Sequence, residues 1–217
     1  TPRKPYKIMN KDTMVAEENN QAGREESVAR PLRADAQRSA DAIVDAALEV
    51  FARSGVEAPV REIAARAGVG IGTLYRRFPQ RSDLIVAVFR QQVDACADAA
   101  PLLAADHQPA EALALWLQRY VDFIATKRGL ASALHSGDPA YASLPSYFDA
   151  RLRPALQALL QAAASAGEVR GDVEPDDLLR AVGSLCLSAQ DDLAYARRMV
   201  ALLVDGLRFG SAQPPRA

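Results

Sequence analysis

The sequence predicts an all-α protein of about nine helices, in which a small N-terminal unit of three helices precedes a larger helical part. Apolar residues recur every three or four positions along most of the chain, which is the period of a helix with one buried face. Proline and glycine interrupt this period at intervals that suit helix lengths. No segment alternates apolar and polar residues as a half-buried strand does, so we expect no sheet.

Four parts are expected along the chain. They are an extension over residues 1–33, a three-helix unit over 34–81 with its central motif at 59–78, a larger helical part over 82–210, and a tail over 211–217. The extension carries scattered charges without helical periodicity, so we expect it to be disordered. It also lacks the apolar core and cleavage site of a secretory signal. Lys4, Lys7 and Lys11 leave open a basic arm instead of a plain extension.

Residues 59–78 predict two short helices joined by a glycine turn. In the first, the apolar residues of 60–67 fall at the i, i+3, i+4 and i+7 positions of one helix face. Pro59 suits the first helical position because its missing N–H would have no partner within the helix. Gly68 supplies the positive φ at which a helix ends abruptly.

The second helix of this motif, over about residues 70–77, turns polar side chains outward. Leu74 and Phe78 lie four positions apart and are expected to pack inward. The outer positions carry hydrogen-bond donors that suit phosphates and base edges, namely Thr73, Tyr75, Arg76 and Arg77. Two short helices joined by such a turn form a helix-turn-helix, whose second helix enters the major groove of DNA.

Four blocks of residues follow one another between Ala34 and Val88. They are Ile43–Phe51 with Ser54-Gly55, Val60–Ala64 with Ala67-Gly68-Val69, Gly72–Phe78, and Arg81–Leu84. In this order and over this length, they resemble the DNA-binding domain of the TetR family of transcriptional repressors. The resemblance implies a DNA-binding regulator.

The resemblance also implies which residues touch DNA. It assigns Thr73, Tyr75 and Arg81 to phosphates, Ile71, Gly72 and Arg77 to the floor of the groove, and Arg76 to the same surface. The plainer alternatives are that Tyr75 is a core aromatic and that Arg76 and Arg77 form a solvated face; Arg77 also suits a phosphate. The chain departs from the family where Pro59 stands in place of the usual Ser or Thr cap. It departs again where Arg81 replaces the usual Lys but keeps the charge.

Charge is divided unevenly along the chain, although the net charge is only −1. Residues 1–90 carry 15 Lys and Arg against 12 Asp and Glu, whereas residues 91–217 carry 11 against 15. A basic N-terminal half on an acidic body suits a protein that holds DNA at one end. Because the excess is small, we expect the affinity to depend on dimerisation.

Further helices are expected beyond the motif, over about residues 82–100, 109–127, 129–136, 141–165, 175–190 and 192–209. The breaks between them fall at Pro101, Pro109, Gly129, Gly137-Asp138-Pro139, Gly167 with Gly171, and Pro175. The first of these helices opens with Ser82 beside Asp83, whose charge suits a helix N-terminus. Because this helix belongs to both parts, it is expected to carry a displacement from one to the other.

Two apolar stripes near the C-terminus suit self-association. The expected interface residues are Leu178, Val182 and Leu185 in the first stripe, and Met199 and Leu203 in the second. In the family, the last two long helices of each subunit form a four-helix interface, and the resemblance carries this over to the two stripes. Packing within one chain is the alternative, since a helix satisfies one apolar face either way.

The middle of the chain holds the aromatic residues at which a ligand is expected. They are Trp116, Tyr120, Phe123, Tyr147 and Phe148. At helical spacing they suit the lining of a cavity between helices, and equally a plain core. Arginines nearby leave both a neutral aromatic and an anionic effector open.

Other chemistry finds little support in the sequence. No Gly-rich phosphate loop follows a strand, and no Ser or Cys nucleophile has an ordered His, so an enzyme is not expected. His135 has no second ligand at metal spacing, and neither a metal nor another cofactor is expected. Cys96 and Cys186 lie within helical patterns, which suits small buried residues and a reducing cytoplasm. No run of about 18 apolar residues indicates a membrane span.

The sequence therefore predicts a homodimeric, ligand-responsive transcriptional regulator with repression as its expected output. A two-fold dimer would place its reading helices about 34–36 Å apart, one turn of B-DNA, and would bind a palindromic operator in double-stranded DNA. A small-molecule effector would release it. The alternative is a DNA-binding regulator without an effector, whose C-terminal part serves only dimerisation or protein contacts.

Overall fold

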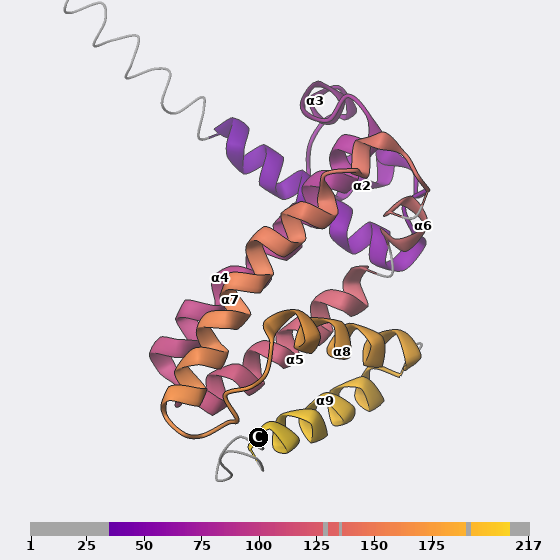
Figure 1. Cartoon of the computed structure of the whole chain (residues 1–217). Helices are drawn as coiled ribbons and strands as arrows, with labels where there is room; N and C mark the ends of the chain where they lie inside the picture. Colours follow the sequence, from indigo (N-terminus) through magenta and orange to yellow (C-terminus); the bar gives the residue numbers. More distant parts are fainter. Residues whose placement is uncertain (1–34, 128–129, 135, 190–191, 209–217) are drawn as a thin grey trace, which may run out of the picture.

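The computed structural model describes residues 35–127, 130–134, 136–189 and 192–208, and within them all regular structure is helical. A first helix, α1, covers residues 35–54. It is followed by α2 (Val60–Arg66), α3 (Ile71–Arg77), α4 (Arg81–Asp106), α5 (Pro109–Lys127), α6 (Ala131–Leu134), the 3-10 helix η2 (Pro139–Tyr141), α7 (Leu144–Ser165), α8 (Pro175–Ser188) and α9 (Leu193–Arg208) (Figure 1). The all-α prediction is confirmed over the described residues, and the expected number of helices is close. The predicted extension (1–33) and tail (211–217) lie outside these residues.

The helices form a small unit, α1 to α3, and a larger body, and α4 belongs to both (Figure 1). With 26 residues at 1.5 Å each, α4 is about 39 Å long. Beyond the small unit it packs mainly on α5 and α7, while α8 and α9 pack on α5 and on each other. A single helix therefore connects the two parts.

The small unit has its own core because each helix turns one apolar face inward. Ile43 and Phe51 of α1, Ile63 of α2 and Leu74 of α3 are buried together. The predicted turn is present as well: Gly68 has φ +67°, and the main-chain N–H of Val69 donates to the carbonyl of Ala64 at 3.0 Å. This αL ending lets α2 stop after two turns and redirects the chain into α3.

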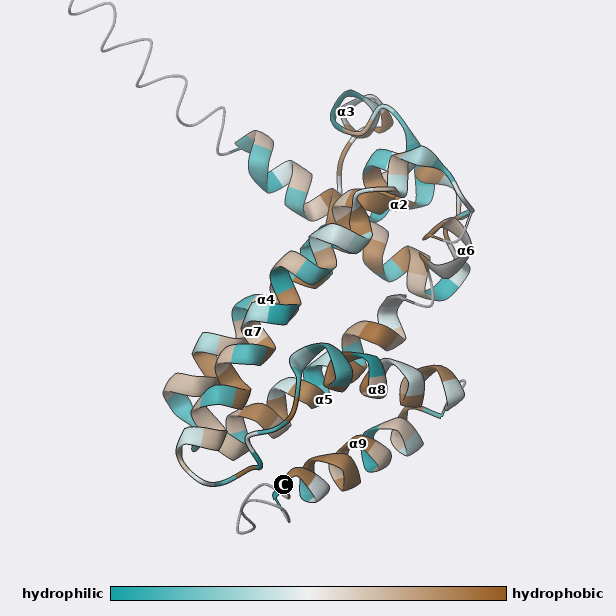
Figure 2. Ribbon diagram, in the orientation of Figure 1, coloured by the Kyte–Doolittle hydropathy of each residue, from teal (hydrophilic) through white to brown (hydrophobic). Residues whose placement is uncertain are grey.

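Apolar and polar residues segregate along the helices of the body. In α9, Ala196, Val200, Val204 and Leu207 recur at intervals of three or four and are buried, and Figure 2 shows the resulting brown and teal stripes. The buried stripe faces α5 and α8, which are the neighbours of α9. Amphipathic periodicity thus decides how the last helices pack.

Three predicted boundaries are wrong. Pro101 does not end the helix, because α4 continues to Asp106. A proline removes one main-chain hydrogen bond, but Ala99 and Ala100 beside it are buried, and this packing outweighs the missing bond. The helix expected over 141–165 begins at Leu144 instead, since the Asp138 side chain accepts from the N–H of Ala140 at 2.9 Å and stabilises a separate 3-10 turn over Pro139–Tyr141. The short α6 occupies only part of the expected 129–136.

Candidate nucleic-acid interface

One face of α3 is exposed although it carries large side chains. Leu74 is buried and Phe78 is partly buried, and at about 100° per residue Gly72 and Arg76 lie on the side of the helix opposite Leu74. Ile71 and Tyr75 flank this outer face and are each 49% exposed. Because exposed large apolar side chains mark interaction surfaces, this face is the candidate interface.

The exposure of Tyr75 decides one alternative: its ring lies on the surface and not in the core. Arg76 lies beside Thr73 on the next turn, with 3.4 Å between its Nη2 and the hydroxyl oxygen of Thr73. The structure therefore brings Ile71, Gly72, Thr73, Tyr75 and Arg76 together on one short helix.

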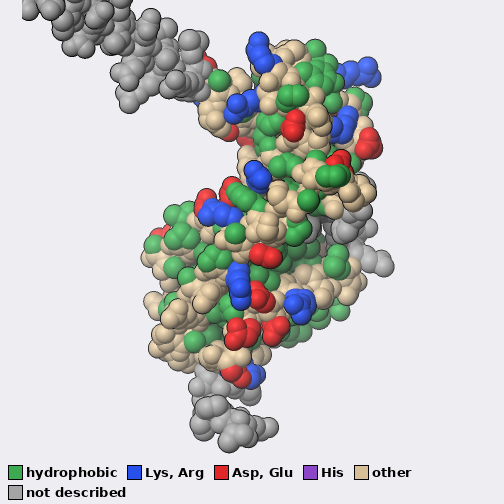
Figure 3. All heavy atoms as spheres, turned by 45° about the horizontal axis from the view of Figure 1, so that its top comes forward, with side chains coloured by type: hydrophobic (Ala, Val, Ile, Leu, Met, Phe, Trp, Pro, Cys, Tyr) green, Lys and Arg blue, Asp and Glu red, His purple; other side chains and the backbone are tan. Residues whose placement is uncertain are grey.

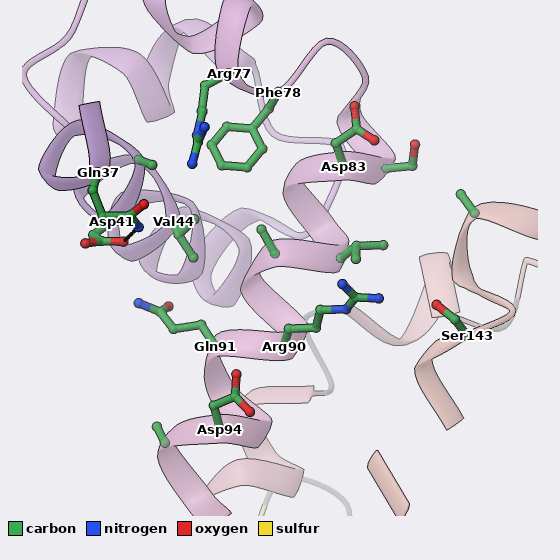
Figure 4. A pocket seen from close by; sticks show the side chains of 16 residues that line it. Gln37, Asp41, Val44, Arg77, Phe78, Asp83, Arg90, Gln91, Asp94 and Ser143 are labelled. Carbon is green, nitrogen blue, oxygen red and sulfur yellow. Dashed lines mark hydrogen bonds between the residues drawn. The ribbon is translucent and has the colours of Figure 1, made fainter. Parts of the chain in front are cut away.

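Arg77 points elsewhere. Its side chain lines an open cavity of about 850 Å³ between α1, α4 and the segment that precedes α7 (Figure 4). Asp41 of α1 and Arg90 and Gln91 of α4 line the same cavity. Arg77 is exposed, so a contact with DNA stays a prediction, but its side chain does not share the outer face of Gly72 and Arg76.

Arg81 is also occupied within the chain. Its Nη1 donates to the main-chain carbonyls of Val56 and Ala58, the latter at 2.9 Å, and its side chain is partly buried. The phosphate contact that the resemblance implies for Arg81 stays a prediction. The amino-acid sequence does not predict these carbonyl partners, because they lie 23 and 25 residues earlier in the chain.

Charge around the small unit is partly neutralised. Arg53 pairs with Glu62 at 3.2 Å, and Arg66 pairs with Glu49. Within the described residues, Arg76 and Arg77 form no ion pair. Figure 3 shows Lys and Arg side chains spread over the upper, N-terminal part with Asp and Glu side chains among them, and side chains of both signs on the lower body.

Four of the aromatic residues predicted to line a ligand site form a packed cluster, namely Trp116, Tyr120, Phe123 and Phe148. Trp116 stacks on Tyr120 with 5.8 Å between ring centroids, and Tyr120 stacks on Phe123 at 6.0 Å. The Trp116 indole N–H donates to the carbonyl of Cys96 at 2.9 Å. Burial raises the pKa of the Cys96 thiol to about 12, so this thiol is protonated at neutral pH. The four rings lie together in an arrangement typical of a core, and a ligand site at them stays a prediction.

A polar cluster that the sequence analysis missed joins α4 to α7. The Tyr147 hydroxyl donates to the Asp94 carboxylate at 2.7 Å, and Arg151 binds both Asp94 (2.7 Å) and Asp98 (2.6 Å). The Arg90 guanidinium lies 5.0 Å from the centre of the Tyr147 ring. A signal was available, because Asp94 and Asp98 lie four apart on one helix and Tyr147 and Arg151 lie four apart on another.

The predicted interface residues divide into two groups. Leu178 and Val182 are buried within the single chain, which matches the alternative of internal packing. Leu185, Met199 and Leu203 are partly exposed. The most exposed large apolar residues of α8 and α9 are others, Leu187 at 72% and Leu202 at 61%.

Within the described ranges, no helix combines the length and the hydropathy that a membrane span requires. In the same residues, no three His, Cys, Asp or Glu side chains lie together as metal ligands would.

An exposed short helix on a helix-turn-helix unit, carried by a larger helical body, defines a DNA-binding regulator. The family described as "Bacterial regulatory proteins, tetR family" matches residues 43–88, and the family described as "Transcriptional regulator SbtR-like, C-terminal domain" matches residues 108–209. The chain belongs to the TetR family of bacterial transcriptional regulators.

Solved structures agree with this assignment. A TetR transcriptional regulator from Streptomyces coelicolor is 40% identical, covers 78% of this chain and 98% of its own, and has a TM-score of 0.69. A TetR regulatory protein from Mycobacterium vanbaalenii is 37% identical. The match covers 82% of this chain and 99% of that protein, with a TM-score of 0.64. HTH-type transcriptional regulators of Staphylococcus aureus are 38% identical over 64 residues, and the match spans only 35% of their length and 29% of this chain.

We expect Tyr147→Phe to lower the free energy of unfolding by about 1 kcal/mol, since it removes a hydrogen bond to a charged group. Burial and Asp94 raise the pKa of Tyr147 above its usual value of 10, so the folded chain holds the phenolic proton more tightly than the unfolded chain does. This stability is present below pH 10 and is lost as the pH rises above it. Denaturant unfolding at pH 7 and above pH 10 measures both effects.

The matched control is Tyr75→Phe, because Tyr75 is exposed on α3 and unfolding is measured without DNA. Equal stability of the two variants, with equal pH dependence above pH 10, would contradict a stabilising role for the α4–α7 cluster.

Proposed function

We propose that the protein is a homodimeric repressor that binds a palindromic operator through α3 of both copies and is released by a small molecule. The exposed face of α3 carries this proposal. Gly72 leaves room for close approach to base edges, Ile71 offers an apolar contact for a thymine methyl, and Thr73, Tyr75 and Arg76 offer donors to phosphates and bases. Arg77, which lies beside this face, would also contact the duplex. Two free, buried cysteines suit work in the cytoplasm.

Dimerisation would use the outer sides of α8 and α9. Leu187, Tyr195 and Leu202 present exposed apolar surface there, flanked by Leu185, Met199 and Leu203. Leu178 and Val182 would support this surface from within the chain. A two-fold axis between these helices would set the α3 helices about 34–36 Å apart, the spacing of successive major grooves.

The effector would act in the body, and two solved structures with the same fold are described as complexes with small molecules. A TetR-like regulator from Mycobacterium smegmatis (23% identical, TM-score 0.58) is described in complex with proflavine, and a regulator from Bacillus subtilis (22%, 0.56) in complex with stearoyl-CoA. At these identities the likeness shows the fold alone. We propose that Trp116, Tyr120, Phe123, Tyr147 and Phe148 line the site once the rings separate.

A second candidate is a dimeric regulator without a small-molecule effector. The stacked rings of Trp116, Tyr120 and Phe123 favour it, because a filled core needs no ligand. The described cavities are lined by other residues, the largest of them beside α1 and α4.

The proposal is tested by selecting bound duplexes from a random pool with the full-length protein. We expect a palindrome whose half-sites lie about 10 base pairs apart, centre to centre. Binding of no duplex, even at low ionic strength, would contradict the proposal.

Gly72→Ala tests whether the outer face of α3 meets DNA. An added Cβ meets nothing within 4 Å in the free chain, and Ala favours a helix over Gly by about 1 kcal/mol, so we expect unfolding to cost more. We expect the affinity for the selected duplex to fall at least about tenfold, because the methyl group would hold the backbone away from the groove. Gly171→Ala, in the segment between α7 and α8, is the control for the affinity. An unchanged affinity in Gly72→Ala would place the DNA contact elsewhere.

Leu202→Glu tests the dimer. We expect the dimer dissociation constant to rise at least about 100-fold, since an unpaired charge would be buried at the interface. Leu102→Glu is the matched control, because Leu102 is 66% exposed on α4. Sedimentation of both variants measures the effect, and an equally stable dimer in Leu202→Glu would remove α9 from the interface.

Trp116 reports on the effector site because it is the only tryptophan. We expect any compound that releases the selected duplex in a screen to change the Trp116 emission, since the stacked ring must move. A screen without a releasing compound would favour the second candidate. Release with unchanged emission would place the effector away from the aromatic cluster.

A further inference from the structure

We infer that Arg81 is a positioning residue, which ties the turn between α1 and α2 to the start of α4 and so fixes the orientation of the reading helix. The inference rests on the proposed binding of DNA by α3. It gives Arg81 a role that differs from the phosphate contact implied by the family resemblance.

The first argument is the geometry of the contact. One nitrogen, Nη1, donates to the carbonyl oxygens of both Val56 and Ala58. The side chains of Val56 and Ala58 are buried in the core of the small unit, so their carbonyls are fixed acceptors. Because Gly55, just before these residues, adopts φ +74°, a conformation that glycine reaches without strain, the turn depends on the two contacts of the guanidinium for its rigidity.

The second argument is electrostatic. Arg81 is the first residue of α4, and a cation at a helix N-terminus is unfavourable. Two carbonyl dipoles directed at the guanidinium offset this cost. The end of the helix is stabilised separately, since the main-chain N–H of Gln80 donates to the Asp83 carboxylate at 2.9 Å. The carbonyl contacts therefore stabilise the charge of Arg81, while the end of the helix is capped without help from Arg81.

The third argument is location. Ala58 is two residues before Val60, where α2 begins, so a change in the turn would tilt α2 and with it α3. Arg81 also lines a cavity of about 430 Å³ together with Glu57 of the same turn and with Asp138 and Tyr141. The contact between Arg81 and the turn therefore lies where the body meets the small unit.

The two roles predict different binding data. A phosphate contact carries no sequence information, so its loss weakens all duplexes equally and lowers the salt dependence by about 0.9 per phosphate. Loss of the Arg81 contacts with the two carbonyls leaves the number of phosphate contacts unchanged. It makes the orientation of α3 less well defined, so the preference for the correct sequence falls.

The experiment compares Arg81→Ala and Arg81→Gln with wild type, on the selected duplex and on an unselected duplex of equal length, over a range of salt concentrations. Titration at high protein and DNA concentrations gives the active fraction of each variant, so that unfolded protein does not enter the affinity. We expect the preference for the selected duplex to fall about tenfold while the salt slope stays as in wild type. Arg76→Ala is the matched control, because it removes an arginine from the outer face of α3 and leaves the contacts of Arg81 intact.

Amide hydrogen exchange without DNA gives a second readout. We expect faster exchange of the main-chain N–H groups of Gly55 and Ala58, which donate to the carbonyls of Phe51 and Gly55, in both Arg81 variants. This result supports the positioning role even if wild type binds no duplex and the proposed function fails. An unchanged exchange rate would overturn the inference. A lower salt slope with unchanged sequence preference would also overturn it and assign Arg81 to a phosphate.

Discussion

The rigidity of α4 is the constraint on which the other features depend. Its apolar face is buried from Leu84 through Ala100, against the small unit at one end and against α5 and α7 at the other. Polar contacts hold both sides as well: Gln91 donates to Asp45 of α1 at 2.7 Å, and Asp94 accepts from Tyr147 of α7. The small unit therefore has little freedom to rotate about the junction. In a dimer, the angle of α4 in the body would set the distance between the two α3 helices, so a change in the body would reach DNA through this helix.

The fold followed from local information to a large extent. Periodicity at 60–67, Pro59 and Gly68 located the helix-turn-helix, and the breaks at Pro109 and Pro175 located the starts of α5 and α8. The boundaries that failed are those at which distant contacts compete with local preference. Pro101 stays within a helix because the alanines before it pack on neighbouring helices, and no property of residues 97–106 alone announces that packing.

The candidate interface could be predicted only in part, because side-chain direction depends on tertiary structure. Spacing placed Tyr75 and Arg76 on the outside of α3 correctly, since Leu74 and Phe78 define the inner side. The direction of Arg77 and the partners of Arg81 depend on α1 and on the turn after it, which are remote in sequence. For the same reason, a stripe of apolar residues in α8 did not distinguish a face within one chain from a face between chains.

The two helix-internal prolines have a mechanical consequence. Pro101 of α4 and Pro154 of α7 line the same cavity of about 320 Å³, so the two neighbouring helices lack a main-chain hydrogen bond at the same level. A helix bends at least cost where such a bond is missing. Bending of α4 and α7 would therefore concentrate at this level. The parts of the two helices nearer the small unit, which Asp94 and Tyr147 join, would move together as one rigid segment.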